Sequence, residues 1–244
     1  MAEQAPAGAG THERHMPAHL RREIDRLDKR VNEGDPLWPA QLAVAVAIAL
    51  HLTLSDKIVI GPRWLIPAVE GLLLLTLVVS TPWRAKGVKP ERHRRLLWAI
   101  LALVTVTYLV SLGLLTHFLI TGGKAGGHAL IGSGVVLWVT NILLFAVIYW
   151  ELDGGGPFDR SAKKKFWGDF EFPQQDNPNI TPKHNDWRPT FLDYLYTALT
   201  NATAFSPTDT MPITQTSKVL MGIQGTAAII TIGLVVARAV NILG

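Results

Sequence analysis

The chain has 244 residues, of which 48% are hydrophobic, and its formal net charge is only +4. It contains no cysteine, which excludes disulfides, thiolate metal sites and cysteine nucleophiles. The apolar residues lie in long runs rather than at amphipathic spacing, which is typical of an integral membrane protein. The lipid bilayer is therefore the expected partner, and the small, unevenly placed charge indicates orientation in a membrane rather than a nucleic-acid partner.

The first segment, residues 1–36, is polar and charged, and no short apolar stretch follows its basic residues as in a cleavable signal peptide. Apolar residues recur within it at i, i+4, i+7 and i+11, namely Leu20, Ile24, Leu27 and Val31. This spacing predicts a charged amphipathic helix with one apolar stripe. Such a helix would lie in the membrane interface or serve as a solvated, partner-binding coil, and both interpretations are open.

Five apolar runs follow, and each is long enough to cross about 30 Å of hydrocarbon as a helix. They cover residues 37–54, 64–82, 96–120, 129–150 and 219–243. The predicted fold class is all-α, a polytopic membrane helical bundle with five transmembrane helices. The transmembrane domain would extend over residues 37–244.

Lys and Arg gather in alternate segments. Six precede the first run, six lie between the second and third, six lie at residues 160–188 in the long loop after the fourth, and three lie in the other two loops together. Because cytoplasmic loops carry an excess of basic residues, this alternation predicts a cytoplasmic N-terminus and an external C-terminus. The expected location is the cell inner (plasma) membrane, with several passes.

Among the polar side chains inside the predicted spans, four are singled out as candidates: Glu70, Asn141, Gln224 and Arg238. Ionisable residues at such positions are costly and are functional hypotheses by default. Arg238 is close enough to the predicted outer surface to extend to it. Glu70 is too short to do so, and would be buried neutral, be paired with a cation such as Arg238 or Lys218, or line water.

The last span also carries small residues on or close to one side, Gly222, Thr226, Gly233 and Ala237. Small residues allow two helix backbones to approach closely, so this face predicts helix packing, with a cavity as the alternative.

The fourth span ends in the stretch "YWELDGGGP". Tyr149 and Trp150 are typical of the membrane interface, and Glu151 and Asp153 are expected to mark the exit into water. Gly154–Gly156 and the following proline are expected to end the helix, since glycine adopts left-handed conformations freely.

A short helix is predicted before the last span. Thr190 and Asp193 have the spacing of a capping box, and a helix over residues 191–204 would be about 21 Å long at 1.5 Å per residue. This length is too short to cross the bilayer, and Pro207 follows. A short helix, a polar turn and a full span together form the plan of a re-entrant loop.

The stretch "DYLYTALTNATAFSPTDTMPITQTSKVLMGIQ", together with "YWELDGGGP", resembles a family of bacterial integral membrane proteins with no established activity. The resemblance covers residues 141–244. The same segment is more distantly similar to the pore helix, filter and inner helix of potassium channels, with Thr203, Asp209 and Pro212 at roughly corresponding places. However, residues 205–208 contain no glycine, and Pro207 has a fixed φ, so a carbonyl-lined potassium filter is excluded.

Two functions are open. The first is a non-enzymatic structural or interaction membrane module of unknown activity, in which the polar turn is a cap and Asp209 accepts hydrogen bonds. The second is a channel- or transporter-like protein, a homo-oligomer with a cation-attracting constriction at residues 200–210. The candidate residues of this turn or constriction are Asn201, Thr203, Ser206, Thr208 and Asp209. An enzyme is not expected because no nucleophile–base set is visible, and neither a cofactor nor a metal is expected.

Overall fold

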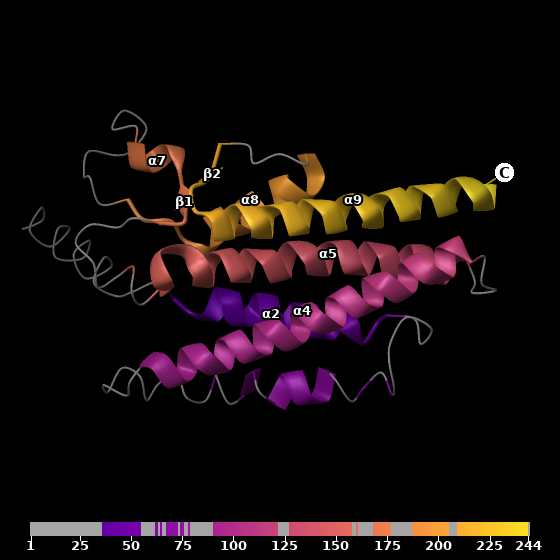
Figure 1. Ribbon diagram of the computed structural model, residues 1–244. Helices are drawn as coiled ribbons and strands as arrows, with labels where there is room; N and C mark the ends of the chain where they lie inside the picture. The colour runs from indigo at the N-terminus through magenta and orange to yellow at the C-terminus, as the bar shows by residue number, and fades with distance from the viewer. Residues whose placement is uncertain are drawn as a thin grey trace, which may run out of the picture. The chain divides into compact units, whose positions relative to one another are not determined.

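The computed structural model describes most of the chain after its N-terminal tail (Figure 1). The described residues are 36–54, 62, 64, 67–72, 74, 75, 78, 90–121, 127–157, 160, 168–176, 187–204 and 209–243. The predicted amphipathic helix at residues 20–31 lies outside them.

The described chain is mainly α-helical, as predicted. Three helices are long and apolar enough to cross a membrane: α4 (Pro90–Ile120), α5 (Gly127–Leu152) and α9 (Gln215–Leu243). They correspond to the third, fourth and fifth predicted spans. The all-α class and the membrane character therefore agree with the structure.

The first two predicted spans are less well supported. Helix α2 (Trp38–His51) has 14 residues, which correspond to about 21 Å, and it ends before the predicted boundary at residue 54. Of the second span, Trp64 lies in a turn, residues 67–72, 74, 75 and 78 are helical, and the rest lies outside the described residues. Five crossings are therefore not established.

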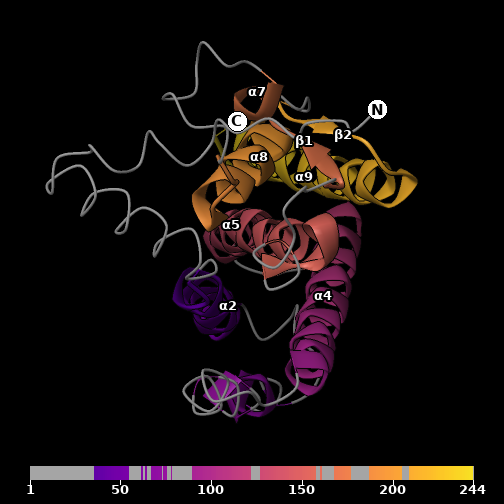
Figure 2. The same ribbon diagram turned by 90° about the vertical axis from the view of Figure 1, so that its left-hand side faces the viewer.

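Helix α5 is the central element of the bundle. It packs against α2 and α4 on one side and against α8 (Phe191–Ala204) and α9 on the other (Figures 1 and 2). Its second half is almost completely buried, and Ala146, Val147, Tyr149 and Trp150 have no exposed surface. Because the second half of α5 is surrounded by other elements, it has no polar face and reads as a continuous apolar run.

Helix α8 occupies the predicted range, from residue 191 to residue 204. The backbone N–H and the hydroxyl of Thr190 donate to the Asp193 carboxylate at 2.7 and 2.8 Å, so the acidic half of the predicted capping interaction is present. The helix is amphipathic. Tyr194, Thr197, Ala198 and Asn201 are buried, whereas Leu192 and Tyr196 are exposed.

The glycine run after α5 ends that helix as predicted. Residues Gly154, Gly155 and Gly156 have φ of 60°, 91° and 94°, a region that side chains disfavour. The chain forms the short 3-10 helix η3 (Asp153–Gly155) and later the two-residue strand β1 (Phe170–Glu171) and the helix α7 (Pro173–Asp176). Strand β1 pairs antiparallel with β2 (Met211–Pro212), which ties this loop to the start of α9.

Candidate functional site

Gln224 of α9 is the centre of a buried polar network between α5, α8 and α9. Its side chain has no exposed surface. Its Nε2 donates to Ala198 O at 2.9 Å, and its Oε1 accepts from Tyr149 Oη at 2.6 Å and from Asn201 Nδ2 at 2.7 Å. The Gln224 amide is thereby bonded to α8 through its nitrogen and to both α5 and α8 through its oxygen. These bonds fix how the three helices pack.

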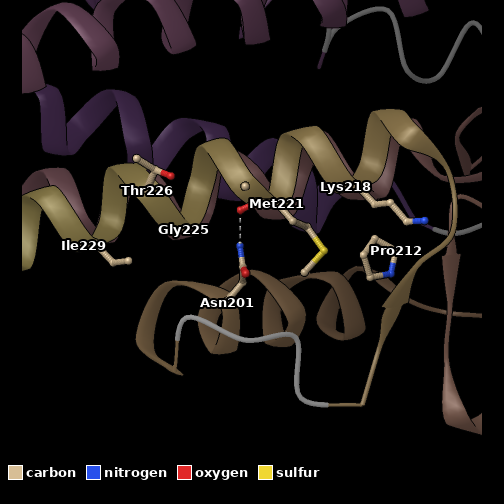
Figure 3. Close-up of a pocket in the computed structure, with 8 residues that line it drawn as sticks. Asn201, Pro212, Lys218, Met221, Gly225, Thr226 and Ile229 are labelled. Atoms are coloured by element: carbon tan, nitrogen blue, oxygen red, sulfur yellow. Dashed lines mark hydrogen bonds between the residues drawn. The ribbon is translucent and has the colours of Figure 1, made fainter.

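Asn201, the first of the predicted turn residues, belongs to this network and points toward α9. Its Nδ2 also donates to Met221 O at 3.0 Å, the bond drawn in Figure 3. The side chain is 4% exposed. Its amide therefore takes part in helix packing. Gly225 of α9 lies close to it, since a Cβ added at Gly225 would be 3.9 Å from Asn201 Oδ1.

Asn141 extends the network to α4. Its Nδ2 donates to Tyr108 Oη at 2.9 Å and makes a longer contact of 3.4 Å with Gln224 O. The side chain is fully buried, and its Oδ1 has no donor among the described residues. Two of the four intramembrane polar residues singled out in the sequence, Asn141 and Gln224, are thus brought together by the fold.

The threonine hydroxyls of α8 are bonded to their own helix. Thr197 Oγ1 donates to Asp193 O at 2.9 Å, Thr200 Oγ1 to Tyr196 O at 3.0 Å and Thr203 Oγ1 to Leu199 O at 2.8 Å. Such bonds to the preceding turn are common for Thr in apolar helices. Thr203, a predicted turn residue, is itself exposed.

Asp209 lies at the end of the polar turn. Its side chain is exposed, and it makes no hydrogen bond or ion pair with any residue that the structure describes. A carboxylate that caps the turn would accept hydrogen bonds, so the exposed position of Asp209 does not fit the cap interpretation. The two remaining turn residues, Ser206 and Thr208, lie outside the described residues.

An open groove of about 350 Å³ runs beside this region, along α9 (Figure 3). Asn201 and Pro212 border it on one side. Gly222, Gly225 and Thr226 form its floor on α9. These three α9 residues are small, whereas Lys218, Met221 and Ile229, which also line the groove, have long side chains.

A second polar cluster, at the end of α5, was not predicted. Asp153 was expected to face water, but it has no exposed surface, and Glu151 is 3% exposed, so that expectation is wrong for both. The Asp153 carboxylate accepts hydrogen bonds from the backbone N–H groups of Asp169 and Phe170 and from Tyr194 Oη. The following loop folds back over the helix end and supplies the donors that water would otherwise provide.

Arg160 and Asp169 complete this Asp153 junction. Arg160 is 2% exposed, and its Nη1 donates to Trp150 O at 2.6 Å and to Asp153 O at 2.8 Å, which satisfies the last carbonyls of the helix. The Asp169 carboxylate accepts from Thr214 Oγ1 at 2.7 Å and from Gly154 N at 3.1 Å. The junction therefore connects α5, the loop before β1 and the segment that begins α9.

Glu70 and Arg238, the remaining two predicted residues, make no hydrogen bond with either cluster among the described residues. Glu70 has no exposed surface, as expected for a group inside the bundle. The expected ion pair with Arg238 or Lys218 is not among the contacts of the described residues, and neither Glu70 oxygen has a hydrogen-bond donor there. Arg238 is half-buried, and its Nε also has no acceptor among those residues.

Within the described part of the chain, no group of three or more His, Asp or Glu side chains is arranged to hold a metal ion. The two polar clusters are built from internal hydrogen bonds that join helices. Compared with known protein families, curated proteins and solved structures, the chain gives no match.

Proposed function

We propose that this chain is a non-enzymatic, multi-pass membrane protein that serves as a structural or interaction module. In this proposal it crosses a bacterial plasma membrane five times with a cytoplasmic N-terminus, and the partner of its exposed helix face is a second copy of the chain. The three long apolar helices support insertion in a membrane. The alternation of basic residues supports the orientation.

The exposed face of α9 carries the proposal. Only 28% of an apolar 18-residue stretch of α9 is buried, compared with 61% of the corresponding stretch of α5. Its small residues, Gly222, Thr226, Gly233 and Ala237, are all exposed, and a Cβ added at either glycine would meet nothing within 4 Å. Small residues allow close helix–helix contact in a bilayer, and within this chain no helix occupies that face among the described residues.

The polar network supports a structural role for α8. Asn201 points into the bundle and bonds α9, and the hydroxyls at residues 197, 200 and 203 bond their own helix. Polar groups that line a conducting constriction would instead point toward a water-filled axis. These bonds favour α8 as a re-entrant helix that is held in place by α5 and α9.

The test is the oligomeric state of the purified full-length protein. Replacing Gly222 and Gly233 together by Leu should convert the oligomer to a monomer, as measured by native mass spectrometry or by energy transfer between labelled copies in liposomes. Gly113→Leu is the matched control, because Gly113 is an exposed glycine on α4 with nothing within 4 Å. A wild-type monomer, or an equal loss in the control, rejects the proposal.

Cation conduction is the second candidate, and the exposure of Asp209 favours it. An exposed carboxylate just beyond the C-terminus of α8 would attract cations, as would the negative end of the helix dipole. Liposomes that contain the wild-type protein should show no cation flux under the structural proposal. Flux that Asp209→Asn reduces at an unchanged melting temperature would favour conduction instead.

A further inference from the structure

A small cavity lies inside the bundle, away from the α8–α9 region. It is bounded by α2, the helical segment 67–72, α4 and α5. Besides aliphatic side chains, five polar residues line it: His51, Glu70, Tyr108, Ser111 and Thr140. This set is unusual for a bundle interior, because polar groups in an apolar environment are costly unless they are hydrogen-bonded.

Three polar atoms at this cavity have no partner among the described residues. They are both carboxylate oxygens of Glu70 and Nε2 of His51. Glu70 is 0% exposed and His51 is 7% exposed, so water outside the protein does not reach these atoms. An ionised carboxylate in such a place is stable only if a cation or a proton compensates its charge.

The Thr107 hydroxyl of α4 stands close enough to the Glu70 carboxyl to interact with it. The same hydroxyl donates to Leu103 O, at 2.8 Å. One hydroxyl that is shared in this way does not replace the counter-charge that a buried carboxylate needs.

No basic side chain that is permanently charged lines the cavity, since its described lining includes neither Lys nor Arg. Its titratable groups are Glu70 on the segment 67–72, His51 on α2 and Tyr108 on α4, and α5 contributes only Thr140 and aliphatic groups. The cavity volume is about 10 Å³, which is close to the space that one water molecule or one small ion needs.

We propose that this cavity is a binding site for one small monovalent cation, a proton or an ion of the size of Na⁺, with Glu70 as its charged ligand. The hydroxyl oxygens of Ser111 and Thr140 and the imidazole of His51 are the neutral groups around it. The oxygen atoms suit a hard cation, and a proton would reside on the Glu70 carboxyl. Tyr108 joins the cavity to the Gln224 network, because its hydroxyl accepts from Asn141.

The first test measures the melting temperature of the full-length protein in detergent between about pH 6 and about pH 9, in choline chloride, KCl or NaCl of equal ionic strength. In choline chloride the wild-type melting temperature should fall as the pH rises, because the proton that compensates Glu70 is lost. If the ligand is an ion of Na⁺ size, NaCl should raise the melting temperature by about 5–10 °C at a concentration near 100 Kd. If only a proton binds, NaCl and KCl should act alike.

Two variants isolate Glu70 from the other titrating groups. Glu70→Gln keeps the shape of the side chain and removes its charge. The melting temperature of this variant should therefore lose the dependence on pH and Na⁺ that Glu70 causes in the wild type. Glu91→Gln is the matched control, because Glu91 is an exposed acid at the start of α4, and it should behave as the wild type. A Glu70→Gln variant that keeps the full wild-type dependence, or a wild type with none, overturns the proposal.

Chemical labelling decides the question even if Glu70→Gln does not fold. A hydrophobic carbodiimide such as dicyclohexylcarbodiimide reacts with a protonated carboxyl. The carboxyl oxygen adds to the carbodiimide carbon and the proton moves to one nitrogen; acyl transfer to the other nitrogen then gives a stable N-acylurea with no leaving group. Peptide mass spectrometry of the wild type should find this adduct on Glu70, with less adduct as the pH rises. Na⁺ should protect it only if an ion of that size binds, and absence of the adduct at about pH 6 overturns the proposal.

Discussion

Two carboxylates in this protein are equally buried but have opposite surroundings. Asp153 and Glu70 both have no exposed surface. Asp153 accepts hydrogen bonds from two backbone N–H groups and one tyrosine hydroxyl, whereas Glu70 accepts none from the described residues. Burial alone therefore does not distinguish a structural acid from one that is free to bind a ligand. The two are distinguished by the number of hydrogen-bond donors directed at the carboxylate.

The same contrast separates the two sides of α5. On the side of α8 and α9, the side-chain oxygen and nitrogen of Gln224 both have partners. On the side of α2, the imidazole Nε2 of His51 has no acceptor or donor among the described residues. One side is built to hold helices together, and the other keeps polar groups available inside the bundle. Substitutions on the two sides should therefore have different costs.

The largest effect is expected for Asp153→Ala. It removes the acceptor of three hydrogen bonds and leaves buried donors of Asp169, Phe170 and Tyr194 unpaired. The expected loss in the free energy of unfolding is about 3–5 kcal/mol, measured by denaturant titration in mixed micelles. Asp169→Ala, which removes two acceptor contacts, should cost less. A loss below about 1 kcal/mol for Asp153→Ala would contradict the structural role of the junction.

Gln224→Ala should have the next largest effect. It leaves the Tyr149 hydroxyl and one Asn201 contact without their acceptor, and it opens a small cavity. Hydrogen bonds between membrane helices average about 0.6 kcal/mol, so the lost bonds and the cavity together predict a loss of about 2–3 kcal/mol. Gln215→Ala at the exposed start of α9 is the control and should change the stability little. Equal effects at the two positions would show that the network does not stabilise the bundle.

Glu70→Met tests the other side of the comparison. Since no donor among the described residues bonds Glu70, an apolar side chain of similar size breaks no hydrogen bond there. The free energy of unfolding, measured without Na⁺, should therefore stay within about 1 kcal/mol of the wild type or increase. A loss of several kcal/mol would mean that the carboxylate has a structural partner, and it would remove the contrast with Asp153.

Local sequence rules were sufficient where a segment is defined by its own residues. The limits of α8 followed from Thr190, Asp193 and the length of the stretch, because a cap and a proline act within a few residues. The end of α5 followed from the glycine run for the same reason. The first span was predicted too long because apolar composition continues past His51, while the helix stops there.

The partners of the polar residues could not be predicted in this way. Asn141 and Gln224 were recognised as polar residues inside spans, but their contacts with Tyr108, Tyr149 and Asn201 depend on the packing of four helices. The misplacement of Asp153 has a similar cause. An acid at a helix end normally faces water, and only the return of the loop at residues 168–170 buries it.

The smallest effect is expected for Asp209→Ala. Asp209 was considered a cap of the polar turn, in which case its loss would leave buried donors unpaired and would cost about 1–3 kcal/mol. In the structure its carboxylate is exposed and has no partner among the described residues, so the same Asp→Ala change that is severe at Asp153 should here stay within about 0.5 kcal/mol of the wild type. Thermal unfolding of the two variants side by side measures the difference. A loss of 1 kcal/mol or more at Asp209 would restore the cap interpretation.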